Sequence, residues 1–269
     1  MPVLRALRNY LIAGGFALSF VPGANAAEIP GVDDPVVQAC IDKTAASRSV
    51  TQHITLRSFD DSGLIEESIA DIYLQRSAEN KSRAVIRLSG PPSRKGLAVL
   101  MLESDKLDPT MYLYVPDLRR TRKVTGKQLA ASMMGTDFSY EEFSHFQRSA
   151  AESKTQRLDD RTFDGVATYV LETTPAGTDS PYRRILTYID QQRCVPLKTE
   201  FLSPDDAVMK ELIATPDSIR DVGEVHIPHQ VIMYDRVKNT RTELGIEDLV
   251  LDAKINDTIF SPKRLGMAP

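Results

Sequence analysis

Strand-like segments separated by turn residues run through most of this chain, and no other feature constrains its fold as strongly. Ser49 to Phe59 alternates in polarity and is rich in β-branched residues, the turn Asp60-Asp61-Ser62-Gly63 follows, and Leu64 to Arg76 returns as a second strand. Further strands are expected at 84–89, 98–103, 111–115, from 157 onwards, and at 167–173, 184–189, 197–202, 209–214, 229–237 and 241–251. The chain is therefore predicted to be mainly β, after a short helix over 35–44.

Many of the expected strands are apolar on both sides. In 184–189, for example, Ile185 and Ile189 alternate with Leu186 and Tyr188. Such a strand can line an interior with one face while its other face is also covered. This pattern predicts one curved antiparallel sheet with helices against its concave side, and a two-layer sandwich is the alternative. Because no repeat or linker divides the chain, residues 27–269 are expected to form a single domain.

The first 26 residues have the features of a secretory signal peptide. Arg5 and Arg8 precede an apolar run from Tyr10 to Val21, and Ala24-Asn25-Ala26 is a small-x-small cleavage pattern. The run is too short to span a bilayer, although an uncleaved anchor remains an alternative. A mature protein that begins near Ala27 and is exported, most simply to a bacterial periplasm, is therefore expected. No cysteine lies at the cleavage point, so no lipid anchor is expected there.

The net charge argues against one class of partner, and the cysteine content predicts a disulfide. The net charge is −4, and removal of the signal peptide, which has two arginines and no acid, makes the mature chain more acidic. Nucleic acid is therefore not an expected partner. The two cysteines, Cys40 and Cys194, predict a disulfide in an oxidising compartment, and two buried free thiols are the alternative.

Motifs that would indicate catalysis are missing from the sequence. It has no Gly-x-Ser-x-Gly elbow, Walker A loop or Gly-x-Gly-x-x-Gly. His226 and His229 would point to opposite faces of a strand, which argues against a shared metal. We therefore predict no catalytic residue, cofactor or metal.

Two neighbouring segments are candidates for binding. The first is the only dense basic run, which contains Arg119, Arg120, Arg122, Lys123 and Lys127. It is interpreted either as a strand edge protected by charge or as a site for lipid headgroups or an acidic partner. The second interrupts the strands: helix-forming residues over 127–134 lead into an apolar cluster in which Asp137 and Ser139 are candidate helix N-caps.

The sequence YLYVPDLRRTRKVTGKQLAASMMGTDFSYEEF, residues 112–143, resembles the tyrosine–x–proline, basic-run and GSDFSYED segment of the LolA-like outer-membrane lipoprotein-sorting family. Residues 196–201 and 256–265 resemble a strand and the C-terminal signature of that family. The resemblance implies an incomplete antiparallel β-barrel wrapped around helices, with an apolar cavity for acyl chains. It also implies a periplasmic carrier without catalytic residues. The receptor version of the family is anchored by a lipidated cysteine, whereas this chain has Ala27 at its mature start.

Two functions remain open at this stage. One is a carrier for the acyl chains of lipoproteins or other envelope lipids, which it delivers towards the outer membrane. The other is a lipid-sensing regulatory or exporter-accessory module that binds lipid without transporting it. The resemblance adds two expected partners, an inner-membrane exporter of the RND/MMPL type and an outer-membrane acceptor.

The apolar cluster of the second segment is the expected lipid-binding flap. It comprises Met133, Met134, Phe138, Tyr140 and Phe143, with Gly135 as a candidate hinge. Methionine side chains repack readily around varied shapes, which suits a flap over a mixed cargo. The alternative is that the same side chains plug the end of the barrel as part of its core.

Overall fold

The protein is mainly β, as the strand pattern predicts. The computed structural model describes residues 34–44, 48–77, 81–103, 110–147, 154–175 and 180–267, so the expected signal peptide lies outside the described residues. The first half of the sheet contains β1 (Ser49–Asp60), β2 (Gly63–Arg76), β3 (Ser82–Gly90), β4 (Ala98–Leu102), β5 (Thr110–Val115) and β6 (Arg120–Val124). The second half contains β7 (Lys154–Phe163), β8 (Val166–Thr174), β9 (Arg184–Asp190), β10 (Pro196–Leu202), β11 (Val208–Ala214), β14 (Gln230–Asp235) and β15 (Thr240–Leu251).

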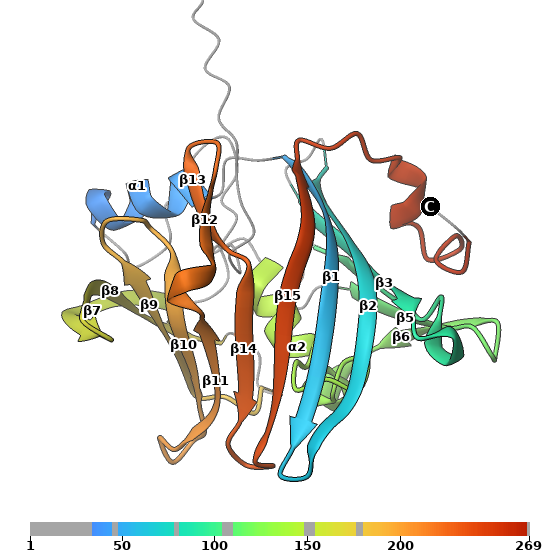
Figure 1. The fold of residues 1–269 in the computed structure, drawn as a ribbon, viewed down its shortest axis with the longest axis horizontal. Coiled ribbons are helices and arrows are strands. Elements are labelled where there is room, and N and C mark those ends of the chain that lie inside the picture. The colour runs from blue at the N-terminus through green and yellow to red at the C-terminus, as the bar shows by residue number, and fades with distance from the viewer. Residues whose placement is uncertain are drawn as a thin grey trace, which may run out of the picture.

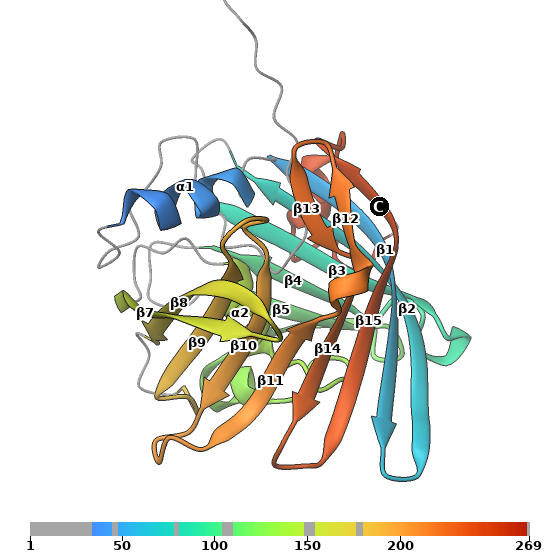
Figure 2. The same cartoon turned by 60° about the vertical axis from the view of Figure 1, so that its left-hand side comes forward.

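These strands form one 13-stranded sheet in the order β6-β5-β4-β3-β2-β1-β15-β14-β11-β10-β9-β8-β7. Every neighbouring pair is antiparallel. The sheet curves strongly, but its edge strands β6 and β7 do not pair with each other, so the barrel is incomplete (Figures 1 and 2). The fold class predicted from the sequence is therefore confirmed, and the sandwich alternative is not found.

Alternation along the strands places the main core on the concave side. In β1, for example, Ile54 and Leu56 are buried, whereas Arg57 is exposed. Residues directly opposite on β2, such as Ala70 and Ile72, point to the same face and join the same core. The interior is thus built from strands that are far apart in the sequence.

The convex side of the first half of the sheet is covered by the C-terminal segment, residues 252–267. Its helical turn η5 (Asp257–Phe260) runs outside β3, and Ile259, Phe260 and Leu265 pack against Val85 and Leu100 (Figure 1). On β9, the outward side chains Leu186 and Tyr188 join a separate cluster with Val170 and Leu202. These two outer clusters explain why so many strands are apolar on both sides.

The two α-helices take different positions. Helix α2 (Tyr140–Gln147) lies against the concave side, as expected, whereas α1 (Pro35–Thr44) lies at one end of the barrel beside the β12–β13 hairpin (Figure 2). A disulfide joins Cys40 of α1 to Cys194 after β9, with Cα atoms 5.0 Å apart. A cross-link across 154 residues stabilises by about 5 kcal/mol in the chain-entropy model. The disulfide therefore holds α1 at the rim of the barrel, outside its concave interior.

Other details differ from the sequence-based expectations. The hairpin of β12 (Ile219–Val222) and β13 (Val225–Pro228) was not expected, because its two strands have only four residues each. Of the helix-forming stretch 127–134, only part is helical, as the 3-10 helix η2 (Gly126–Ala130). Within the described part of the chain, no helix is long and apolar enough to cross a membrane.

Candidate functional site

The concave side contains a small apolar cavity beneath residues 132–147, which we call the inner segment. The lining is apolar except for Thr136 and comprises Ile54, Leu56, Ile72, Ile86, Met133, Met134, Thr136, Phe138, Phe143 and Leu244. Its volume is about 50 Å³. A protein cavity of about 150 Å³ holds benzene, so this space is too small for an acyl chain while the inner segment stays in place.

The five side chains expected to form the flap come together in the core. Met133, Met134, Phe138 and Phe143 line the cavity, and Tyr140 is buried in the same cluster without lining it. Each of the five is only 6–7% exposed. Burial raises the pKa of Tyr140, so its phenol stays neutral. In this conformation the five residues close the interior, which is compatible with both the flap and the plug interpretation.

The first part of the inner segment is a tight loop. Ser132 and Ser139 pair with each other as a single antiparallel β-bridge. Between them the loop turns at Met134 and Gly135, which have φ values of 54° and 73°. An added Cβ on Gly135 would lie 3.4 Å from the guanidinium of Arg94. Arg94 donates to the Met134 carbonyl at 2.6 Å and is paired with Glu66 of β2. We call the contacts of Arg94 with Glu66 and with the Met134 carbonyl the Arg94 clasp. Gly135, which was expected to be a hinge, has no side chain and so allows the loop to approach this clasp closely.

Asp137 fixes the other side of the loop to β15. Its carboxylate accepts hydrogen bonds from the hydroxyls of Thr240 at 2.5 Å and Thr242 at 2.8 Å. The backbone N–H of Asp137 in turn donates to the Thr242 hydroxyl at 2.9 Å. Asp137 and Thr242 are both buried, so these bonds are not exposed to competition from solvent. Asp137, a candidate N-cap in the sequence, instead joins the loop to the sheet through these hydrogen bonds.

Helix α2 begins with a capping box. The Glu142 N–H donates to the Ser139 hydroxyl at 3.3 Å, and the Ser139 N–H donates to the Glu142 carboxylate. Ser139 is therefore the N-cap that the sequence suggested. The acidic residues Glu141 and Glu142 lie in the first turn, where the helix dipole favours negative charge.

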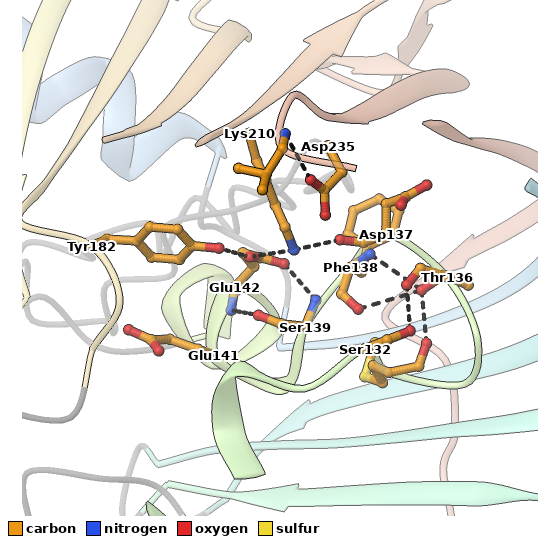
Figure 3. A network of polar contacts seen from close by, with 12 residues as sticks. Ser132, Thr136, Asp137, Phe138, Ser139, Glu141, Glu142, Tyr182, Lys210 and Asp235 are labelled. Atoms are coloured by element: carbon orange, nitrogen blue, oxygen red, sulfur yellow. Dashed lines mark hydrogen bonds and ion pairs between the residues drawn. The ribbon is translucent and has the colours of Figure 1, made fainter. Parts of the chain in front are cut away.

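Glu142 is also the centre of a buried polar network (Figure 3). It is 0% exposed, and its Oε1 atom lies 3.0 Å from the Lys210 ammonium of β11 and accepts from the Tyr182 hydroxyl. Lys210 also donates to the Asp137 carbonyl at 2.7 Å. Burial, followed by the charge of Glu142, raises the pKa of Tyr182, so its hydroxyl remains a donor. The network joins helix α2, the loop, strand β11 and the segment that precedes β9.

Sequence analysis found only part of this network. Asp137 and Ser139 were candidates because short polar residues before a helix are typical caps. Lys210 and Tyr182 were missed because only the fold brings β11 and residue 182 to the inner segment. In the sequence, a single lysine in a strand looks the same whether its side chain is buried or exposed to solvent.

Three residues of the basic run, Arg120, Arg122 and Lys123, lie on β6, which is an edge strand of the sheet. Arg119 is in the turn before β6, and Lys127 is in η2 after it. The fold extends this basic surface with Lys263 and Arg264, because the Thr121 hydroxyl of β6 donates to the Pro262 carbonyl at 3.3 Å. Within the described chain, neither these two residues nor the basic residues at 119, 120, 122, 123 and 127 form a salt bridge. At the adjoining β5–β6 turn, Leu118 is 70% exposed. We call the surface formed by the basic residues at 119, 120, 122, 123, 127, 263 and 264 the cationic edge, and the exposed Leu118 is its apolar tip.

The two histidines near β13 do not form a metal site. The Nδ1 atom of His226 lies 2.7 Å from an Asp221 carboxylate oxygen, whereas that of His229 lies 3.1 Å from the Ile227 carbonyl oxygen. The described residues contain no group of three or more side chains that could hold a metal.

Comparisons with known proteins agree with this architecture. A domain from Vibrio parahaemolyticus assigned to outer-membrane lipoprotein sorting is 19% identical, with a TM-score of 0.78, over 86% of this chain and 97% of its own. A DUF1329 family protein from Desulfovibrio piger is 18% identical, with a TM-score of 0.78, over 86% and 96%. A LolA superfamily protein from Nitrosomonas europaea is 19% identical, with a TM-score of 0.60, over 80% and 91%.

At this level of identity the solved structures establish the fold. A search of curated protein sequences found no match. A protein-family model described as "Uncharacterized protein" matches residues 80–267, which is more than half of the chain. The chain therefore belongs to this family, and its fold is an open barrel like those of the lipoprotein-sorting domain and the LolA superfamily protein.

Proposed function

We propose that the protein is a periplasmic carrier that binds acyl chains of lipoproteins or other envelope lipids in its concave interior and delivers them towards the outer membrane. The observation that carries the proposal is the apolar cavity between the sheet and the inner segment. Burial of each CH₂ group is worth about 0.8 kcal/mol, so even a partly covered chain would bind usefully. Binding of this kind needs no catalytic residue.

Loading requires the inner segment to move, because the cavity of about 50 Å³ is too small for a chain. Contacts of Met133, Met134 and Phe138 with the β1–β3 wall are apolar, so an acyl chain can replace them at little cost. On the opposite side, Asp137 and Glu142 hold the segment to β15 and β11. We therefore expect the segment to open at the Arg94 clasp and to stay attached through Asp137 and Glu142.

A cavity-filling substitution tests this proposal. Leu244→Trp on β15 should occupy the space and weaken binding of a fluorescent long-chain fatty acid by about tenfold or more. Val250→Trp is the matched control, because Val250 is on the same strand and 54% exposed. Titration of the purified protein measures both affinities. Equal affinity in wild type, Leu244→Trp and Val250→Trp would contradict binding in this cavity.

A second measurement separates carriage from lipid sensing. Donor vesicles that contain a self-quenched fluorescent lipid are mixed with acceptor vesicles, with or without the protein. A carrier accelerates transfer in proportion to its concentration, whereas a sensor binds the lipid without accelerating its transfer. The exporter of the RND/MMPL type and the outer-membrane acceptor stay predictions about its partners.

The cationic edge supports a docking role at an anionic membrane surface. Its basic residues lack acidic partners in the described chain, and Leu118 offers an apolar tip beside them. Each basic residue near an anionic membrane contributes about 1 kcal/mol. The double variant Arg120→Gln/Lys123→Gln should therefore reduce cosedimentation with vesicles that contain phosphatidylglycerol. Unchanged cosedimentation would assign this edge to another partner, such as an acidic protein.

A further inference from the structure

Gln52 of β1 is a buried amide without a hydrogen-bond partner. It is 3% exposed, and neither its Oε1 nor its Nε2 atom has a partner among the residues that the structure describes. On the same face of β1, by contrast, the buried Ser58 hydroxyl lies 3.2 Å from the Thr242 hydroxyl. Because buried polar groups are nearly always hydrogen-bonded, this exception needs an explanation.

The side chain of Gln52 points into the barrel beside the cavity. Alternation along β1 puts it on the same face as Ile54 and Leu56, which line the cavity. Its direct cross-strand neighbours are Ile72 of β2, which also lines the cavity, and Leu249 of β15. Both of these neighbours pack in the concave core. The amide thus lies in the apolar wall of the barrel, next to residues that line the cavity.

We propose that Gln52 recognises the amide group of an amide-linked acyl chain while the alkyl part occupies the cavity. This inference rests on the proposed function and specifies its ligand. A glutamine amide has one acceptor oxygen and two donor hydrogens, and a ligand amide has both complementary groups. A bare alkyl chain would leave Gln52 unpaired, and an ester could accept a hydrogen bond but not donate one. The site therefore favours an amide over an ester, and an ester over an alkane.

Displacement of a bound fluorescent fatty acid by dodecanamide, methyl dodecanoate and dodecane tests the proposal. In Gln52→Leu, affinity for dodecanamide should fall by about tenfold, the value of one net hydrogen bond. Affinity for dodecane should stay within about twofold of wild type, and thermal stability should not decrease. Gln75→Leu on β2 is the matched control, because Gln75 already accepts a hydrogen bond from the Arg83 side chain at 2.9 Å and alternation places it on the opposite face of the sheet from Ile72.

The outcomes separate this inference from the function on which it rests. If all three ligands displace the probe and Gln52→Leu leaves dodecanamide affinity unchanged, acyl binding stands and the role of Gln52 is wrong. An equal loss for all three ligands would assign Gln52 to cavity shape and also overturn the inference. Should Gln52→Leu fold poorly, Gln52→Met, which has a similar length, is measured in the same way. If the probe does not bind the wild type, both proposals fail.

Discussion

The inner segment and the C-terminal segment cover opposite faces of the same sheet, but different forces hold them. The inner segment combines apolar side chains with buried polar anchors on β11 and β15. The C-terminal segment relies on Ile259, Phe260 and Leu265, and the acidic member of its Arg83–Asp257 ion pair is 70% exposed. Exposed ion pairs of this kind contribute about 0–1 kcal/mol.

The difference indicates which cover can be displaced. Apolar contacts are not directional, so under the proposed function we expect an acyl chain to replace the contacts beneath the inner segment while the hydrogen bonds of Asp137 and Glu142 keep the segment attached. The polar contacts of the C-terminal segment with the sheet, such as the hydrogen bond from the Ser49 hydroxyl to the Ala253 carbonyl at 2.8 Å, are only partly buried. The segment packs closely at Gly266, where an added Cβ would lie 2.5 Å from the Tyr114 ring. We therefore interpret the inner segment as the movable cover and the C-terminal segment as permanent.

The largest expected effect comes from removal of one partner of the buried ion pair. Lys210→Met should destabilise the protein by about 3–5 kcal/mol, because Glu142 would be left as an uncompensated buried charge. Chemical denaturation measures the loss. Arg57→Met is the control: Arg57 and its partner Glu67 are 53% and 46% exposed, so loss of this pair should leave the free energy of unfolding nearly unchanged.

The double variant Lys210→Met/Glu142→Gln should recover part of that stability, because the charge that lost its partner is also removed. If Lys210→Met alone is as stable as wild type, the ion pair does not anchor the inner segment. The contrast between the two segments would then disappear.

A smaller effect is expected on the convex side. Gly266→Val should destabilise by about 1–3 kcal/mol, because the new side chain overlaps the Tyr114 ring. Acyl-chain affinity should stay unchanged, since the cavity is on the other face. Gly245→Ala is the control and should be tolerated, because an added Cβ there would come no closer than 3.8 Å to the Glu247 carboxylate. A loss of acyl binding in Gly266→Val would show that the two covers are coupled.

The smallest effect is expected at the start of α2. Ser139→Ala removes the side-chain half of the capping box and should cost about 1 kcal/mol. It should also loosen the inner segment, so hydrogen exchange over residues 132–147 should accelerate while exchange over 252–267 is unaffected. Equal acceleration in both segments would indicate global destabilisation instead of a local change in the movable cover.

Local sequence signals determined much of this protein. Alternation and turn residues predicted most strands within a few residues, because a strand with a buried face needs side chains of period two. The pairing of Cys40 with Cys194 followed from there being only two cysteines. Ser139 was recognisable as a candidate cap because it is a short polar residue before acids that suit a helix first turn, although Asp137 was an equal candidate. The four-residue strands β12 and β13 were too short to show any period.

Only the tertiary structure decided what the interior contains. Sheet order brings β1 beside β15, so Thr240 and Thr242 meet Asp137, and Lys210 reaches Glu142 from a strand about 70 residues later. Pairing of β1 with β2 and with β15 places Gln52 between Ile72 and Leu249. An ordinary polar residue of an alternating strand thereby becomes a buried amide that has no hydrogen-bond partner among the described residues. Burial and pairing depend on contacts between distant segments, and no local pattern of residues carries that information.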